Sequence, residues 1–131
     1  MKIVKVGLMS IGIWSDFISP YTSSSVRQFV PRRPGVFVLW EKQTSQAWTC
    51  FLVGKADDLE ARLQTFLKGA EPDAYIRGMV KNECGFHFME ILDPNERSNA
   101  EKYLFDFLKP LLNLVDPGGL RTPIALPVVP C

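Results

Sequence analysis

The chain has 131 residues, enough for one domain with a modest core, and its 47% hydrophobic and 22% charged content is ordinary for a globular protein. Its 15 basic and 14 acidic residues give a formal net charge of +1, which argues against a protein that coats nucleic acid by overall charge but leaves room for a local basic groove. Every apolar run is shorter than the roughly 20 residues of a membrane span, so we expect no membrane partner.

The three cysteines, Cys50, Cys84 and Cys131, are a low and odd number. They fit a reducing compartment better than a disulfide framework, so we expect a cytoplasmic protein. A single histidine and the lack of any Cys-x-x-Cys spacing give no indication of zinc. The early residues, with Asp16 among them, do not have the pattern of a signal peptide.

Residues 1–20 are expected to form an N-terminal extension, in which residues 2–6 alternate as an edge strand would. Residues 21–29 predict a short helix, because Ser and Thr candidates for an N-cap precede Val26 and Phe29. The prolines that follow hold the chain extended at the entry to the next element.

Two apolar runs, residues 34–41 and 47–56, are rich in β-branched and aromatic residues and predict a pair of strands joined by the short polar loop 42–46. Asp57 and Asp58 then open a helix. Its apolar residues recur at helical spacing, and Gly69 is a plausible stop. The residues of this stripe are Leu59, Leu63, Phe66 and Leu67.

The second half of the chain predicts a helix over residues 71–81, a strand over residues 85–92 and a third helix that Asp93 caps and Pro110 ends. Residue His87 alternates with Phe86 and Phe88, so we expect it to lie on the surface. The buried stripe expected for the third helix consists of Ala100, Tyr103, Leu104, Phe107, Leu108 and Leu111.

Residues 116–131 are rich in proline and glycine and predict an extended tail, either laid across the domain or poorly ordered. The body of the domain is expected to span residues 21–115. Its order, β-β-α-α-β-α, predicts a small α+β domain with a three-stranded, mostly antiparallel sheet flanked by helices.

Residues 34–67 resemble the core of the GIY-YIG nuclease superfamily. Gly35-Val36-Phe37 stands where that family has Gly-Ile/Val-Tyr, and Leu52-Val53-Gly54 stands where it has Tyr-Ile/Val-Gly. The loop and helix of the family are matched by Gly54-Lys55-Ala56, Asp58-Leu59 and Arg62-Leu63, and the short helix before Pro34 is also similar. The resemblance implies the fold given above and an origin in metal-dependent endonucleases that hydrolyse phosphodiester bonds of DNA.

The resemblance also implies roles for individual residues. Arg62 matches the helix arginine that neutralises charge on the phosphate, and Glu101 matches the glutamate that binds one divalent ion, Mg²⁺ or Mn²⁺. Asn113, after Lys109-Pro110, matches an asparagine that follows a Lys-Pro pair in the family. Lys55 lies beside the predicted helix, where a phosphate can be held. A substrate-binding surface made of Phe37, Leu52, Lys55 and Asn113 follows from the same alignment.

Each of these residues also has a purely structural interpretation. Arg62 can pair with Asp58, and Glu101 with Arg97, each at a spacing of four residues on a helix. Lys55 can face solvent, and Asn113 can cap loose carbonyls at a helix end.

Both signature tyrosines are replaced, by Phe37 and Leu52. Neither side chain has a hydroxyl, and losing general-base help lowers a rate by ~10²–10⁴-fold. His87 and Tyr75 remain open as substitutes. Trp14, Trp40 and Trp48 are expected in the core rather than as stacking platforms for bases.

Three functions remain open from the sequence: a metal-dependent endonuclease with an altered proton path, a nucleic-acid-binding module, DNA favoured, with reduced or lost hydrolysis, and a catalytically inactive protein-interaction domain that uses its C-terminal tail. A homo-oligomer is also left open. We expect the second of these functions.

Overall fold

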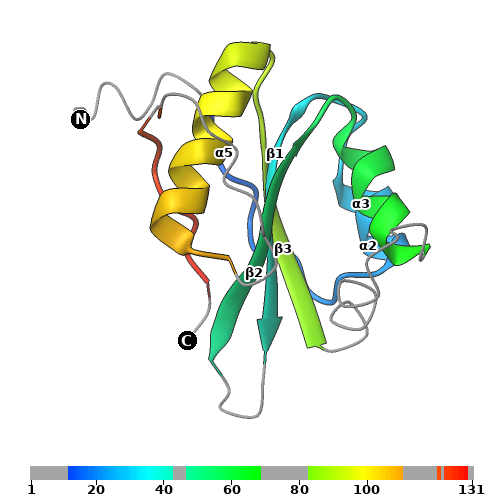
Figure 1. The fold of residues 1–131 in the computed structure, drawn as a ribbon. Helices are drawn as coiled ribbons and strands as arrows, with labels where there is room; N and C mark the ends of the chain where they lie inside the picture. The colour runs from blue at the N-terminus through cyan, green and yellow to red at the C-terminus, as the bar shows by residue number, and fades with distance from the viewer. Residues whose placement is uncertain (1–11, 43–46, 69–82, 111–120, 122, 130–131) are drawn as a thin grey trace, which may run out of the picture.

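A computed structural model of the protein describes residues 12–42, 47–68, 83–110, 121 and 123–129. The predicted strand over residues 2–6, the predicted helix over residues 71–81, Tyr75, Gly69 and Asn113 lie outside the described residues. The described elements, drawn in Figure 1, are α2 (Ser23–Phe29), β1 (Gly35–Lys42), β2 (Trp48–Ala56), α3 (Leu59–Leu67), β3 (Glu83–Glu90) and α5 (Pro94–Leu108).

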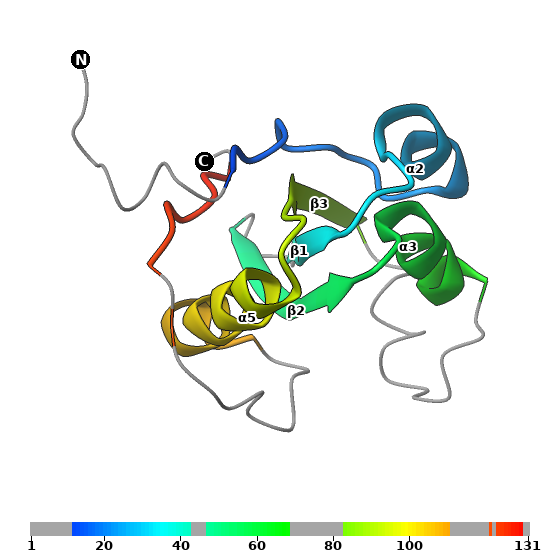
Figure 2. The same ribbon diagram turned by 90° about the horizontal axis from the view of Figure 1, so that it is seen from above.

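The three strands form one antiparallel sheet in the order β2-β1-β3, which confirms the predicted small α+β architecture. Helices α2 and α3 lie on one face of this sheet and α5 lies on the other (Figures 1 and 2). The sheet is therefore buried on both faces, with a separate apolar cluster under each layer of helices.

Strand β1 is the centre of the sheet and its residues from Gly35 to Glu41 are all buried. Phe37 and Leu39 face α2 and α3, whereas Val36 and Val38 face α5, as the alternation of a strand requires. The register between β1 and β2 shifts between Leu39 and Trp40, which is a β-bulge.

Helices α2 and α3 begin where the sequence predicts. Thr22 caps α2 in a capping box with Ser25, and the Asp58 side chain accepts a hydrogen bond from the backbone N–H of Ala61, 3.0 Å away, at the start of α3. The predicted stripe of α3 faces the sheet: Leu59, Leu63 and Phe66 are buried and Leu67 is half-buried.

Helix α5 begins after its N-cap Asp93, as predicted, and ends just before Lys109, whose φ of 49° breaks the helix ahead of Pro110. Its buried stripe is narrower than predicted. Ala100 and Leu104 are buried and Leu108 packs against the same cluster, but Phe107 is half exposed. None of the helices in the described ranges has the length and apolar character needed to cross a bilayer.

The two ends of the described chain meet on the side of β3 and α5. The backbone N–H of Ser15 donates to the carbonyl of Phe88 at 2.8 Å, and Ile18 pairs with Phe86. From the tail, Ile124 is buried in the cluster under α5, and Trp14 Nε1 donates to the Ala125 carbonyl at 2.6 Å. The described part of the tail is therefore laid across the domain, one of the two predicted arrangements.

The prediction that His87 lies on the surface is wrong, because its side chain is only 2% exposed. Its ring points to the opposite face of the sheet from Phe86 and Phe88, as alternation predicts, but that opposite face is covered as well. The indole Nε1 of Trp40 donates to His87 Nδ1 at 3.0 Å, and the rings of Trp14 and Phe17 lie 6.1 and 5.3 Å from it. Trp40 is buried in the core as predicted.

Candidate functional site

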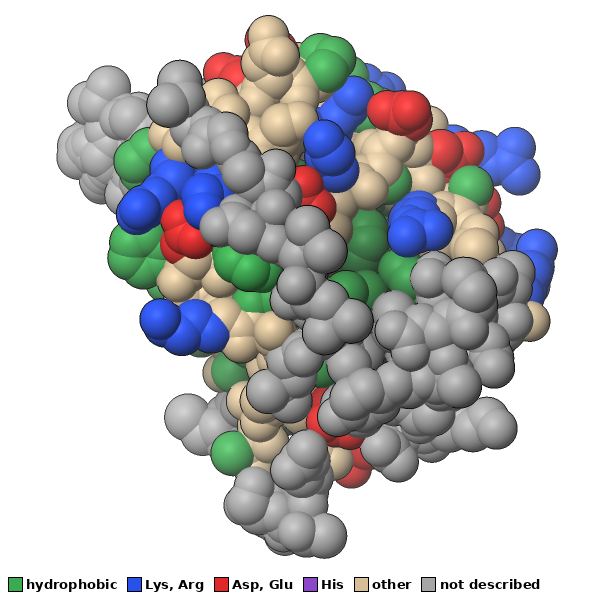
Figure 3. All heavy atoms as spheres, in the orientation of Figure 1, with side chains coloured by type: hydrophobic (Ala, Val, Ile, Leu, Met, Phe, Trp, Pro, Cys, Tyr) green, Lys and Arg blue, Asp and Glu red, His purple; other side chains and the backbone are tan. Residues whose placement is uncertain are grey.

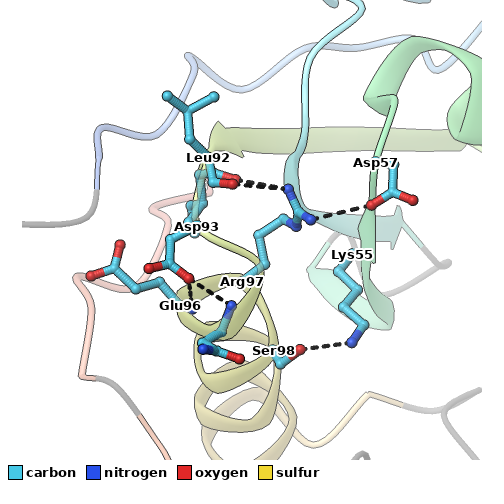
Figure 4. A network of polar contacts seen from close by, with 9 residues as sticks. Lys55, Asp57, Leu92, Asp93, Glu96, Arg97 and Ser98 are labelled. Atoms are coloured by element: carbon cyan, nitrogen blue, oxygen red, sulfur yellow. Dashed lines mark hydrogen bonds and ion pairs between the residues drawn. The ribbon is translucent and has the colours of Figure 1, made fainter.

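Lys55 links the end of strand β2 to helix α5. The sequence placed it in the turn after the strand, but β2 continues to Ala56, so Lys55 is the last residue but one of the strand. It lies on the same face as Val53, the face that α5 covers. Its Nζ donates to the Ser98 hydroxyl at 2.8 Å (Figure 4), while much of the side chain remains exposed.

Glu101 stands next to this contact, one turn further along α5 than Ser98. Its side chain is half-buried, as its predicted place beside the apolar stripe implied. Burial raises the pKa of Glu101, and the positive charge of Lys55 lowers it in part. Two of the predicted site residues, Lys55 and Glu101, are therefore close enough for their charges to interact.

Arg97 is a buried cation that joins three segments around this site. Its guanidinium donates to the carbonyls of Ile91 and Leu92 at 3.2 and 3.4 Å, and to Asp57 Oδ1 at 3.2 Å (Figure 4). The arginine side chain is 9% exposed, whereas that of Asp57 is 99% exposed. These contacts differ from the pairing with Glu101 that helical spacing alone would give, and they fix the start of α5 against the turn after β2.

A hollow of about 370 Å³, which we call the Lys55 pocket, lies between the end of β2 and the first turns of α5. Its walls are mostly polar, and Lys55 is its exposed cation. The lining residues are Lys55, Ala56, Asp57, Pro94, Arg97 and Ser98.

Arg62 lies on the other side of the sheet, on α3. It is exposed, and its guanidinium carbon lies 4.5 Å from the centre of the Phe66 ring, a cation–π contact at the edge of the apolar stripe as predicted. Its charge also acts on Tyr21. Burial raises the pKa of Tyr21, with a smaller raising effect from Cys84 and an opposing effect from Arg62. The Tyr21 hydroxyl donates to the Leu63 carbonyl at 2.6 Å, so this phenol is unsuited to act as a general base.

Phe37 and Leu52 occupy the face of the sheet under α3. Both are buried in the cluster with Phe66, and the Phe37 and Phe66 rings lie 6.0 Å apart. Phe37 is paired across the strands with Gly54, which places the two resemblance motifs side by side. Neither side chain is exposed enough to touch a ligand without movement of α3.

The structure therefore places the predicted residues in two sets. Lys55 and Glu101 lie on the α5 side of the sheet. Phe37 and Leu52 lie on the α3 side, where Arg62 contacts Phe66. Both helices contact β2, the outer strand between them. The face seen in Figure 3 carries Lys and Arg side chains around a patch of hydrophobic surface. That Arg62 and Glu101 serve one ligand stays a prediction.

Among the predicted site residues, Glu101 is the carboxylate expected to bind a metal, whereas the carboxylate of Asp57, which lines the pocket, accepts a hydrogen bond from Arg97. The described parts of the chain contain no group of three or more His, Cys, Asp or Glu side chains placed to hold an ion. A single carboxylate does not make a closed metal cage, but it fits a Mg²⁺ ion that keeps most of its waters and gains further ligands from a substrate phosphate.

Comparison with known proteins adds no relative, because no family model matches the chain and a search of curated proteins finds no match.

Sequence reasoning missed Asp57, Arg97 and Ser98 as members of the site. One signal for two of them was present: Arg97 and Ser98 precede Glu101 by four and three residues, so all three share one side of the helix. Nothing local indicated that Ser98 meets Lys55, which lies 43 residues earlier.

Proposed function

We propose that this chain is a GIY-YIG-like domain, derived from a divalent-metal-dependent DNA endonuclease, that binds nucleic acid and has reduced or lost phosphodiester hydrolysis. The single observation that carries the proposal is that Lys55, which lies at a polar pocket and is bound to Ser98, is near enough to Glu101 for its charge to lower the pKa of that carboxyl group. A cation and a partly desolvated carboxylate at the end of an outer strand are suited to a phosphate group and its counter-ion.

The architecture supports the ancestry. The two strands that carry the resemblance motifs are adjacent and antiparallel, and their motif residues Phe37 and Gly54 are direct partners. The helix with Arg62 follows the second strand, and the helix with Glu101 follows the third. This is the order of parts that the resemblance implies.

Within the proposal, Lys55 holds a phosphate oxygen through its ammonium group. The same contact with Ser98 that holds Lys55 in place leaves its other two N–H donors available to a ligand. Glu101 is the residue that would hold Mg²⁺ or Mn²⁺. A bound divalent ion supplies charge neutralisation at the phosphate and stabilisation of the leaving oxygen.

Reduced or lost hydrolysis follows from Phe37 and Leu52, which offer no hydroxyl where the family has tyrosines. Both side chains are buried, so a water molecule cannot take the place of the missing hydroxyl group at either position. Without general-base assistance, a rate falls by ~10²–10⁴-fold.

Binding is tested by gel shift of a duplex and a single-stranded DNA over a range of salt concentrations. We expect a shift that weakens steeply with salt, and a Lys55→Gln variant whose log–log salt slope is smaller by about 0.9, one phosphate contact. The matched control is Lys42→Gln, which removes the same charge at the other end of the sheet, since Lys42 ends β1 whereas Lys55 pairs with Val36 near its start. An equal decrease of the salt slope in both variants, or a gel shift that does not depend on salt, contradicts the proposal.

Hydrolysis is tested with supercoiled plasmid and Mg²⁺ or Mn²⁺, beside Glu101→Ala. Nicking absent from both proteins, together with a DNA shift, fits lost hydrolysis. Slow nicking that disappears in Glu101→Ala fits reduced hydrolysis. Nicking that survives in Glu101→Ala contradicts the role of that residue.

A second candidate function, a protein-interaction domain without catalysis, is favoured by one observation on the tail. Leu126 and Val128 are 41% and 83% exposed, although the neighbouring Ile124 is buried. Light scattering separates the two candidates: concentration-dependent association that Leu126→Ser with Val128→Ser removes, without any DNA shift, favours this second function.

A further inference from the structure

The buried arginine at the Lys55 pocket has one partner that a ligand can replace. Arg97 donates through Nη1 to the carbonyls of Ile91 and Leu92 at 3.2 and 3.4 Å, and through Nη2 to Asp57 Oδ1 at 3.2 Å. Its guanidinium therefore lies between the Leu92 carbonyl and the Asp57 carboxylate (Figure 4). The two backbone carbonyls hold the guanidinium in place whether or not Asp57 is bound to it.

The contact between Arg97 and Asp57 is open to solvent. The Asp57 side chain is 99% exposed, whereas that of Arg97 is 9% exposed and lines the Lys55 pocket. Because the Asp57 carboxylate is in solvent and still reaches Nη2, an anionic oxygen that arrives from solvent can take the same place. An ion pair with so exposed a partner contributes little to stability, so displacing Asp57 costs little.

Arg97 needs a negative charge beside it, because a buried cation without a counter-charge is costly. Among the described residues, Asp57 is the acid that pairs with it. This carboxylate comes from the turn after β2 and supplies the counter-charge when the pocket is empty. A bound anion can supply the same charge, which makes the two alternatives at one position.

A phosphate group suits this position because the pocket contains a second cation. Lys55 lines the same pocket, and its Nζ is held 2.8 Å from the hydroxyl of Ser98, the residue after Arg97 on α5. A phosphate has at least two unesterified oxygens, so it can accept charge-assisted hydrogen bonds from the ammonium and the guanidinium together. In the structure the Asp57 carboxylate accepts from Arg97, while the Lys55 ammonium donates to Ser98.

We propose that Asp57 occupies the anion position of the Lys55 pocket, and that a phosphate displaces it and is then held by Arg97 and Lys55 together. Arg97 is thus a ligand-binding residue, and Asp57 is a competitor for the ligand's position within the chain itself. The phosphate is free, terminal or internal to a strand, since its charged oxygens are chemically alike. This inference rests on the function proposed for the pocket, which itself requires neither Arg97 nor Asp57.

The test is titration calorimetry of the full chain with inorganic phosphate and with a short DNA duplex that carries or lacks 5′-phosphates. Asp57→Asn removes the competing charge from an exposed side chain, and should tighten binding by on the order of threefold or more. The matched control is Glu83→Gln, which removes one exposed negative charge at the start of β3, at the other end of the sheet. At physiological salt, which screens distant charges, this control should leave the affinity nearly unchanged.

The NMR signal of the Arg97 side-chain Nε–H group reports the exchange of partners directly. Binding of a probe to the wild type should shift this signal as Asp57 leaves. Asp57→Asn should shift it before any probe is added, because its charged partner is already gone.

The three probes distinguish the sources of the phosphate, and each of these results supports the proposal. A gain in Asp57→Asn that needs the 5′-phosphates assigns the site to a terminal phosphate, equal gains with both duplexes assign it to the strand backbone, and a gain with inorganic phosphate alone assigns it to the free ion.

An affinity of Asp57→Asn that is no higher than that of the wild type, or that Glu83→Gln matches, overturns the inference. An Arg97 signal that stays in place while a probe binds does so too. If Lys55→Gln still weakens DNA binding in these cases, the function proposed for the pocket stands without this inference. If no probe binds to the wild type or to Asp57→Asn, both are overturned.

Discussion

The ring of Phe37 lies so close over Gly54 that a Cβ atom added to the glycine would sit 2.5 Å from Phe37 Cζ. The two residues are partners on β1 and β2, and one ends the first motif of the resemblance while the other ends the second. The missing side chain of Gly54 is therefore what lets the tip of the Phe37 ring lie against the neighbouring strand.

Gly54→Ala should destabilise the fold by about 1–3 kcal/mol, the usual cost of overpacking a core. Urea unfolding measures the change. Phe37→Leu shortens the side chain, and in combination with Gly54→Ala it should recover part of the loss, with a coupling energy of about 0.5–3 kcal/mol in the double-mutant cycle. Strict additivity of the two substitutions would show that the ring and the glycine do not constrain each other.

Glu101→Gln should stabilise the protein at neutral pH. Because burial raises the pKa of Glu101, the folded protein binds this proton more tightly than the unfolded chain, and the ionised carboxylate disfavours folding above that raised pKa. The advantage of Glu101→Gln should shrink as the pH falls toward the ordinary glutamate value. Unfolding free energies between about pH 4 and pH 8 measure it.

Lys55→Met provides the matching test of the charge contact. Since Lys55 lowers the pKa of Glu101, its removal should raise that pKa further, which carboxyl NMR titration reads directly. An unchanged Glu101 titration in Lys55→Met would contradict the proximity of the two residues.

Arg97→Met should cost much more stability than Asp57→Asn, although the two side chains form one ion pair. Arg97→Met leaves the carbonyls of Ile91 and Leu92 without this donor, at about 1–3 kcal/mol for a buried unsatisfied group. Asp57 is almost fully exposed, so Asp57→Asn should stay within about 0.5 kcal/mol. Equal effects in thermal unfolding would mean that Arg97 acts mainly through the ion pair.

His87 should make the protein less stable in mild acid. Burial lowers the pKa of His87, against smaller opposing effects from a hydrogen bond to the Val128 backbone and from the charge of Asp16. The unfolded chain therefore takes up this proton first, and stability should fall as the pH drops below about 6.5, by at most about 1.4 kcal/mol per pH unit. His87→Gln keeps an acceptor for Trp40 without titrating, so this variant should lose that part of the slope.

The sequence predicted the elements whose burial pattern and end signals agree. Strands β1 and β2 and helix α3 lie where alternation, the polar loop and Asp58 placed them, because each is determined by residues close along the chain. Strand β3 begins and ends two residues before the predicted range of 85–92, since Leu92 is apolar but belongs to the turn.

The features that the sequence did not predict depend on contacts between residues far apart along the chain. Alternation with Phe86 and Phe88 predicts a surface position for His87. That face is covered by the N-terminal segment around Trp14 and the tail around Val128, which carry no periodic pattern that would indicate it. Around the Lys55 pocket, the resemblance named Lys55 and the neighbouring Glu101, whereas Ser98 and Arg97 owe their contacts to the way α5 packs on β2.

The contact between Trp14 and Ala125 joins residues 111 positions apart, and Ser15 reaches β3 across 73 positions. During synthesis, the N-terminal segment therefore emerges long before either of its docking surfaces exists, and it can dock only after β3 and the segment around Ala125 have been made. A truncated product that stops before Ile124 would leave the cluster under α5 partly uncovered and prone to aggregate.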